Sequence, residues 1–184
     1  MAHNSLMVRN ITHLTDARYF AAMEVDWMSI HLNTMPSSFS EWHTMKDWIE
    51  GVKFAAEIPA DDEMLLAKTI IDAKPDGIIL NQLTFPDVPQ SIQMFYETDA
   101  DDILNLAGEA FYIIPYQPDL LISGRILQLP PNKIFLQTSW SLYQLTQLLD
   151  AGYQGGICLM GGDEEATGVR DYGLMDDLIA LISH

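Results

Sequence analysis

The sequence is poor in basic residues. It has 9 Lys plus Arg against 26 Asp plus Glu among 184 residues, which gives a formal net charge of -17. The field around such a chain repels phosphate backbones and anionic lipid headgroups, so we expect neither a nucleic acid nor a membrane surface as a partner. The acidic residues are spread through periodic apolar segments rather than gathered into a tail, which favours a solvated acidic surface over disorder.

Cysteine and long apolar runs are equally scarce. Cys158 is the one cysteine, which excludes an intramolecular disulfide and a cysteine-based zinc site and suits a reducing compartment. No stretch approaches the roughly 18 apolar residues of a membrane span, and the first residues lack the pattern of a signal peptide. The five histidines show no metal-binding spacing, and no glycine-rich nucleotide fingerprint occurs. We therefore expect a cytoplasmic protein with no metal and no cofactor.

What the sequence does contain is a repeat in which apolar runs of strand length alternate with helix-periodic segments. The inner runs are continuous in Ile, Val, Leu and Phe, as in parallel strands that are covered on both faces. Eight such strands close a barrel, so the pattern predicts a single α/β domain, residues 1–184, with a compact (β/α)8 TIM-barrel fold. The expected strands are 6–11, 27–32, 52–58, 77–81, 92–97, 111–116, 134–137 and 156–160. The expected helices are 14–23, 40–49, 61–73, 101–107, 141–151 and 172–182.

The fourth helix of the barrel is expected to be missing or reduced. Residues 83–90, LTFPDVPQ, contain two prolines and no helical period, whereas a helical crossover needs about a dozen residues. Residues 118–132 form a longer connection, but Gly124 and the pair Pro130-Pro131 predict a short or irregular helix there. The chain is also shorter than the about 250 residues typical of this fold.

Polar residues mark the starts of four predicted helices. Residues 15–16, 40–41, 61–63 and 141 each place an acceptor or a negative charge near a first turn. Gly152 stands where the helix 141–151 should end.

Three segments resemble a known family. CLMGGDEEATGVRD, residues 158–171, resembles without a gap the D-V-S-S-G-V-E-x-x-P-G-x-K-D segment that ends phosphoribosylanthranilate isomerases. MVRNITHLTDA, residues 7–17, resembles the family's opening K-I-C-G-I-T-x-x-E-D-A, and GIILNQ, residues 77–82, stands where the family has A-V-Q-L-H-G. The resemblance covers most of the chain. It implies a TIM barrel, a relation to tryptophan biosynthesis, and an Amadori rearrangement that needs a general acid and a general base.

The sequence departs from the family where the resemblance implies catalysis. The cysteine that ends strand one and acts as the base corresponds to Arg9, whose guanidinium cannot be deprotonated in a protein. The aspartate that ends strand six and acts as the acid corresponds to Pro115, or to Tyr116 if the register slips by one, and the nearest carboxylate is Asp119. The arginine that holds the anthranilate carboxylate corresponds to Ser37. We assign no catalytic residue and expect no isomerase activity; the alternative is an active sugar-phosphate isomerase with relocated catalytic groups.

Ligand-binding candidates remain at the carboxyl ends of the strands, where this fold places its sites. Arg9 either binds an anionic ligand or pairs with an interior acid such as Glu57 or Glu97. Gly161 and Gly162 either cradle a phosphate with their amides or form a plain turn. The expected ligand is a small phosphorylated molecule or another small anion, and the expected role is regulatory, scaffolding or small-anion binding. The predicted mouth residues are Arg9, Asn81, Thr138, Ser139, Gly161 and Gly162.

Two other side chains have open roles. Cys158, inside the last strand, is either a buried small residue or a nucleophile, and no partner base is apparent. His31, at the end of the second strand, either faces the barrel mouth and titrates near neutrality or is a structural histidine.

The missing helix also predicts an assembly. The outer faces of strands 77–81 and 92–97 carry Ile, Leu, Met and Phe, and the short connector between them cannot cover these faces unless Leu83 and Phe85 fold down. An exposed apolar patch of several hundred Å² usually marks an interface. We therefore expect a homodimer, related by a two-fold axis, through the side that lacks the fourth helix.

Overall fold

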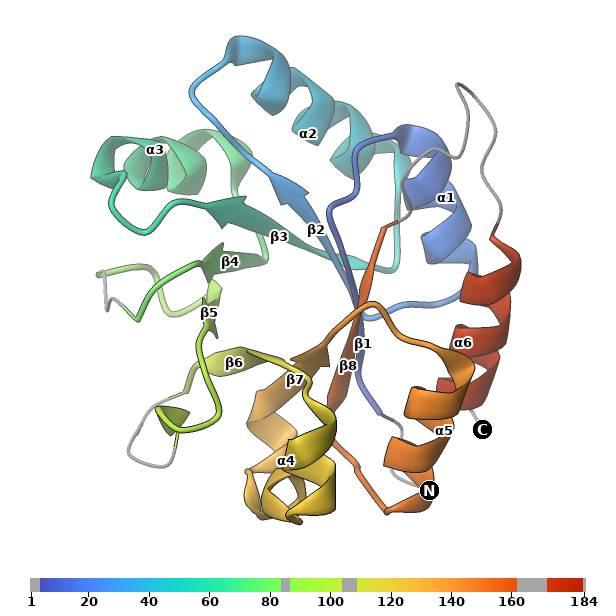
Figure 1. Cartoon of the computed structure of the whole chain (residues 1–184). Coiled ribbons are helices and arrows are strands. Elements are labelled where there is room, and N and C mark those ends of the chain that lie inside the picture. Colours follow the sequence, from blue (N-terminus) through green and yellow to red (C-terminus); the bar gives the residue numbers. More distant parts are fainter. Residues whose placement is uncertain (1–3, 84–86, 104–108, 162–171, 184) are drawn as a thin grey trace.

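The chain closes into an eight-stranded parallel barrel. In the computed structural model, residues 4–83, 87–103, 109–161 and 172–183 are described. The strands hydrogen-bond in sequence order from β1 to β8, and β8 pairs with β1 to complete the ring (Figure 1). This confirms the predicted TIM barrel. The strands are β1 (Leu6–Arg9), β2 (Trp27–His31), β3 (Lys53–Ile58), β4 (Gly77–Leu80), β5 (Gln93–Glu97), β6 (Phe111–Pro115), β7 (Ile134–Gln137) and β8 (Gly156–Met160).

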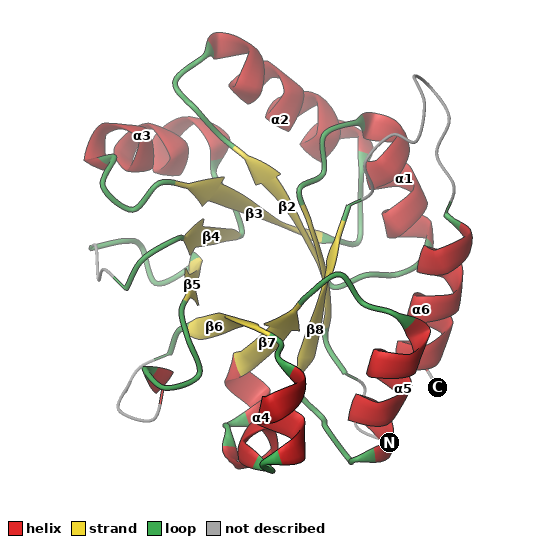
Figure 2. Cartoon of the chain, viewed as in Figure 1, coloured by secondary structure: helices red, strands yellow, loops and turns green. Residues whose placement is uncertain are grey.

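Helices cover the outside of this barrel (Figure 2). Residues Thr69–Ala73 extend α3 as a π-helical turn. None of the helices in the described ranges has the length and apolar character needed to cross a bilayer. The α-helices in the described part of the chain are α1 (Leu14–Ala22), α2 (Pro36–Trp48), α3 (Glu63–Lys68), α4 (Pro118–Ile122), α5 (Leu142–Asp150) and α6 (Gly173–Ser183).

The predicted gap after β4 is confirmed. Residues 81–83 and 87–92, the described part of the connection to β5, contain no helix. The connection from β6 to β7 holds the five-residue α4 and two 3-10 turns, Arg125–Gln128 and Pro131–Lys133, as its glycine and prolines predicted. Most of the expected helix 101–107 lies outside the described residues.

Helix starts were predicted with mixed success. Asp62 caps α3 by accepting from the Leu65 amide, and Ser141 forms a capping box with Gln144 at α5, which stabilises each first turn. By contrast, α2 begins at Pro36 rather than at residue 40, because proline at the first helical position is preorganised for the helix. Ser37 therefore lies in the first turn of α2.

Inward side chains fill the barrel in layers that alternate strands contribute, as is usual in this fold. The lowest layer holds two large rings, Trp27 and Phe111, beside Gly77 and Gly156. The next two layers are largely apolar. Their members are Met7, Ala55, Phe95 and Phe135 in one, and Ser29, Ile79, Ile113 and Cys158 in the other.

The two glycines of the lowest layer leave room for aromatic rings. A Cβ atom at Gly77 would lie 2.9 Å from ring carbons of both Phe95 and Trp27, and one at Gly156 would lie 2.4 Å from the Phe135 ring. Because barrel interiors are close-packed, none of these three rings can move far. Large and small residues thus alternate around the bottom of the barrel.

The outer faces of β4 and β5 are more completely covered than the sequence predicted. Ile78, Leu80 and Tyr96 are buried within a single chain. Leu83 packs against the same core, together with the half-buried Met94. The apolar patch that motivated the dimer prediction is therefore smaller than expected, because part of the connector folds down onto it.

Candidate functional site

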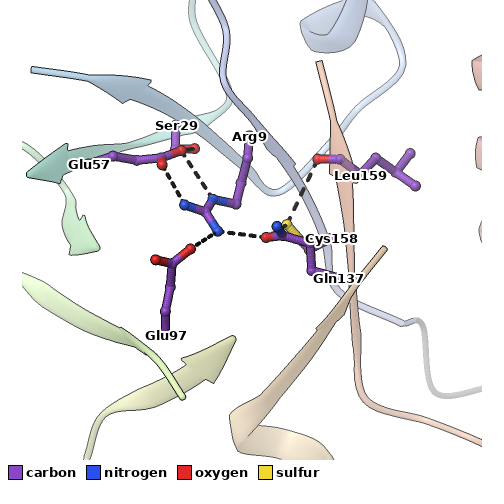
Figure 3. Close-up of polar contacts among 7 residues, drawn as sticks. All are labelled: Arg9, Ser29, Glu57, Glu97, Gln137, Cys158 and Leu159. Atoms are coloured by element: carbon purple, nitrogen blue, oxygen red, sulfur yellow. Dashed lines mark hydrogen bonds and ion pairs between the residues drawn. The ribbon is translucent and has the colours of Figure 1, made fainter. Parts of the chain in front are cut away.

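A layer of four polar side chains closes the carboxyl-terminal mouth of the barrel (Figure 3). They come from the last inward positions of alternate strands: Arg9 of β1, Glu57 of β3, Glu97 of β5 and Gln137 of β7. Three of these strands end at the residue named, so the layer lies where TIM barrels place functional groups. The Arg9 guanidinium lies at its centre and contacts the other three side chains.

Arg9 and Glu57 form a two-pronged ion pair. Arg9 Nε donates to Glu57 Oε1 at 3.1 Å, and Nη2 donates to Oε2. Glu57 also accepts from the Ser29 hydroxyl and from the Asn10 backbone amide. Only 7% of the Arg9 side chain and 15% of the Glu57 side chain are exposed. Charge-assisted, bidentate bonds of this kind are what a buried arginine requires.

The pair keeps both groups charged. Burial alone would raise the pKa of Glu57, but the hydrogen bonds and charge of Arg9, with the Ser29 hydroxyl and the Asn10 amide, hold that pKa below its ordinary value. Burial alone would lower the pKa of Arg9, but the hydrogen bonds and charge of Glu57, together with the charge of Glu97, favour the charged form, and the pKa of the guanidinium is raised. Glu57 is therefore an ionised and fully engaged carboxylate near neutral pH.

Glu97 is held less firmly. It accepts from Arg9 Nη1, which also donates to Gln137 Oε1 at 2.6 Å. Among the described residues Arg9 is the one hydrogen-bond partner of the Glu97 carboxylate, and 36% of the Glu97 side chain is exposed. Glu97 is thus the more exposed of the two carboxylates in the layer.

Two cavities open at the mouth, and Glu97 lines both. The smaller, about 200 Å³, is lined by Arg9, His31, Glu57 and Asn81 among others. The larger, about 490 Å³, has an apolar side formed by Leu83, Ile113 and Pro115. Its polar lining consists of Glu97, Thr98, Asp99, Asp102 and Gln137. Glu97 therefore stands between the two spaces.

A third cavity, about 940 Å³, lies at the opposite, amino-terminal face. Two of the carboxylates that line it support strand starts, since Asp26 accepts from the Leu6 amide and Asp76 from the Phe54 amide. In TIM barrels this face serves stability, so we take the mouth as the candidate site despite its smaller volume.

The structure brings only some predicted site residues to the mouth cavities. Arg9 and Asn81 line the smaller one, although the Asn81 side chain also accepts from the Ala60 amide. Thr138 is half-buried and Ser139 exposed just after β7. Neither is among the described residues that line the two cavities.

Gly161 has a structural reason to be glycine. Its amide donates to the Arg9 carbonyl at 2.6 Å, and a Cβ atom there would lie 2.8 Å from that oxygen. This amide is consequently not free to hold a phosphate. Gly162, the other half of the predicted cradle, lies outside the described residues.

His31 and Cys158, whose roles the sequence left open, lie in different environments. His31 is exposed and lines the smaller cavity, as the mouth-facing alternative predicted. Cys158 is fully buried, and its Sγ donates to Gln137 Oε1 at 3.6 Å. Burial raises the pKa of the thiol, so it stays protonated and serves as a small core residue rather than a nucleophile.

The register of β6 decides which residue stands at its end. Pro115 is the last strand residue and pairs with Gln137, in line with the inward-facing Ile113. Tyr116 packs outward against Trp140, with ring centroids 4.8 Å apart. Asp119 lies exposed in the first turn of α4. Pro115, and not Tyr116, is therefore the mouth residue of this strand.

Two residues that hydrogen-bond within or to the polar layer were not predicted from the sequence. Gln137 and Ser29 contact Arg9 and Glu57, but neither residue type stands out in a strand. The signal was the two-residue alternation, since Gln137 follows Phe135 and Ser29 follows Trp27 on the inward face.

The layer offers little catalytic capacity. Arg9 cannot accept a proton, and Glu57 is held as a carboxylate by three donor residues. Glu97 alone among the four combines a carboxylate with substantial exposure. The arrangement is thus better suited to holding a charged group than to moving a proton across a bound substrate.

Comparison with known proteins shows which solved structures have a similar fold. No family model matches the chain, and no curated protein matches it by sequence. Solved structures do match it. TrpF from Jonesia denitrificans superposes with a TM-score of 0.73 at 11% identity, covering 97% of this chain and 96% of that one. Monomers of the dimeric phosphoribosylanthranilate isomerase from Thermotoga maritima give 0.73 at 11% identity, with coverage of 97% and 98%.

A third match carries a ligand. It is a phosphoribosylanthranilate isomerase in complex with reduced 1-(o-carboxyphenylamino)-1-deoxyribulose 5-phosphate, with a TM-score of 0.73 at 10% identity and coverage of 97% and 98%. At such identities a match speaks for the fold alone. This chain is similar in fold to the phosphoribosylanthranilate isomerases over nearly its whole length, as the resemblance of its opening and closing segments predicted.

Proposed function

We propose that this chain is a phosphoribosylanthranilate isomerase-like barrel protein, related to tryptophan biosynthesis, that does not catalyse the isomerisation and instead binds a small anion at its mouth in a regulatory role. The fold and the sequence segments at residues 7–17 and 158–171 support the relation. The mouth supports the change of role.

One observation carries the proposal. The position that corresponds to the family's base is Arg9, and its guanidinium is fixed among Glu57, Glu97 and Gln137. Its side chain fills the floor of the mouth with a buried ion pair. A group that takes a proton from carbon two of the sugar has no place at the end of β1 while this layer is intact.

The opposite side of the mouth supports the same conclusion. Pro115 ends β6 where the family has its acid, and Asp119 lies four residues further along the chain, exposed in the first turn of α4. Ser37, at the position of the carboxylate-holding arginine, lies in the first turn of α2 and is exposed. Acid, base and substrate clamp are thus replaced together.

The test is the isomerase reaction itself. We expect no loss of phosphoribosylanthranilate fluorescence with the purified protein, and none with the Arg9→Cys/Pro115→Asp variant, because a substrate that is not held loses the contribution of positioning, on the order of 7 to 11 kcal/mol. The Thermotoga maritima isomerase assayed in parallel is the positive control. Turnover of the wild-type chain at ordinary enzyme rates, about 1 to 10³ per second, would refute the proposal.

The position of Glu97 favours one alternative function, that of an active sugar-phosphate isomerase. Glu97 is a partly exposed carboxylate between two cavities, so a relocated general acid or base of an active sugar-phosphate isomerase would have to be this residue. If the wild-type chain does turn over substrate, Glu97→Gln should abolish that activity.

We further infer a homodimer through the β4–β5 side. The apolar side chains of Ile92 and Met94 on this side are only half-buried within one chain. The isomerase from Thermotoga maritima, which is similar in fold, is dimeric. Light scattering at micromolar concentration should give a mass about twice the 20.7 kDa of one chain. Met94→Asp should shift the mass to that of a monomer, while Met64→Asp, at a residue that is 85% exposed on α3, should leave it unchanged. A wild-type mass of one chain would exclude the dimer.

A further inference from the structure

Glu97 occupies a place on Arg9 that a ligand can take. We propose that a small monocarboxylate with an apolar body displaces the Glu97 carboxylate from Arg9 and binds in the 490 Å³ cavity. The inference rests on the proposed function in treating the mouth as a binding site, and it names the chemical class of the anion.

The two carboxylates around Arg9 differ in how firmly they are held. Glu57 makes two bonds to the guanidinium and has two further donors, from Ser29 and from Asn10. Glu97 has its single bond to Nη1, and its side chain is more than twice as exposed, 36% against 15%. Glu57 is therefore a fixed counter-ion, whereas Glu97 can turn into solvent without leaving another donor unpaired.

The cavity lies on the correct side of the guanidinium. Arg9 itself lines the smaller cavity, but both acceptors of its Nη1, Glu97 and Gln137, line the larger one, so these two side chains separate the nitrogen from the larger space. When Glu97 turns away, Nη1 faces the space that the carboxylate has left. A ligand carboxylate placed there keeps the amide oxygen of Gln137 as a neighbour.

The lining selects the rest of the ligand. Leu83, Ile113 and Pro115 give one side of the cavity an apolar surface, which suits a ring or a short hydrocarbon. Asp99 and Asp102 on the same lining repel a second negative charge. A single carboxylate replaces Glu97 charge for charge, but a phosphate dianion adds a charge beside two aspartates. The cavity thus favours a monocarboxylate over phosphate.

Competition by Glu97 makes a quantitative prediction. A site that its own carboxylate fills nine-tenths of the time binds a ligand about tenfold more weakly than the open site. Glu97→Gln replaces the charged competitor by a neutral amide, which is a weaker acceptor from Arg9, and should lower the dissociation constant of benzoate about tenfold, measured by ligand-observed NMR on the full chain. Asp99→Asn is the matched control, because it removes one charge from the same cavity without touching Arg9, and we expect a change of less than about threefold.

Three outcomes decide the proposal. The proposal is supported if Glu97→Gln strengthens benzoate binding, if inorganic phosphate binds more weakly than benzoate, and if Arg9→Met/Glu57→Gln abolishes benzoate binding. That double variant removes the cation and its fixed partner together, which avoids an unpaired buried charge. Equal effects of Glu97→Gln and Asp99→Asn, or binding that survives without Arg9, would overturn it. Failure here leaves the isomerase assay unaffected, and turnover in that assay would refute the proposed function whatever benzoate does.

Discussion

Replacing Arg9 with methionine should lower the free energy of unfolding by about 3 to 5 kcal/mol. Methionine fills much of the volume of arginine but leaves Glu57 as a carboxylate with 15% of its side chain exposed and no cation beside it. Removing one member of a buried pair costs more than removing both, because the uncompensated charge loses its hydration and gains nothing in return. Urea unfolding of the wild type and the variant measures the difference.

The partner variant separates this mechanism from lost packing. Arg9→Met/Glu57→Gln should recover most of the stability, since the amide of glutamine can still accept from the Ser29 hydroxyl without carrying a charge. If the double variant is as unstable as Arg9→Met alone, the loss comes from packing and not from the stranded carboxylate.

Acid should act on the same pair. Because the pKa of Glu57 is lowered in the folded chain, the stability that this group contributes is present above its ordinary value of 4.5 and is lost as the pH falls through the lower, folded value. Unfolding measured between neutral pH and pH 3 should show this loss in the wild type and a smaller one in Arg9→Met/Glu57→Gln.

The second large effect is expected at the bottom of the barrel. Gly156→Ala adds one carbon that would lie 2.4 to 2.7 Å from three atoms of the Phe135 ring, in a cluster whose buried members are at most 7% exposed and against which the half-buried Phe111 packs. Overpacking of a core commonly costs about 1 to 3 kcal/mol, and we expect the upper end here because Phe95 and Phe111 contact the same ring. Thermal unfolding of the variant provides the measurement.

A second substitution identifies the clash. Phe135→Leu removes ring atoms from the position that the new carbon needs, so Gly156→Ala should cost less in a Phe135→Leu background than in the wild type. Additive costs of the two substitutions would mean that Gly156 is required for another reason.

The barrel was predictable from the sequence because its signals are local and repeated. Each strand is a short, largely apolar run, and a break such as residues 83–90, with two prolines and no helical period, predicts directly that a helix is lacking. Helix boundaries were less predictable. Ser40 and Glu41 are good first-turn residues, but Pro36 fixes the start of α2 earlier, and the sequence alone did not rank these competing signals.

The site was predictable only in part. That Arg9 would meet Glu57 or Glu97 follows from the cost of burying a cation, and both contacts are present. Which glutamate is fixed and which is exposed depends on Ser29, on the Asn10 amide and on the barrel's stagger, and none of these can be read from one strand at a time. The sequence likewise left open whether the Gly161 amide would hold a phosphate or serve a plain turn, because its bond to the Arg9 carbonyl joins residues that are far apart in the chain.

The Arg9–Glu57 pair also affects how this protein can change over generations. A mutation that replaces Arg9 by an uncharged residue leaves the Glu57 carboxylate without its cation, and a mutation that neutralises Glu57 removes the fixed partner of a cation with 7% of its side chain exposed. Either order passes through a protein less stable than its parent, and selection against unfolded protein removes such intermediates. The ion pair therefore makes each of the two residues difficult to replace while the other is present. A lineage that carries both keeps them, even where a different residue at the end of β1 would bring a useful activity.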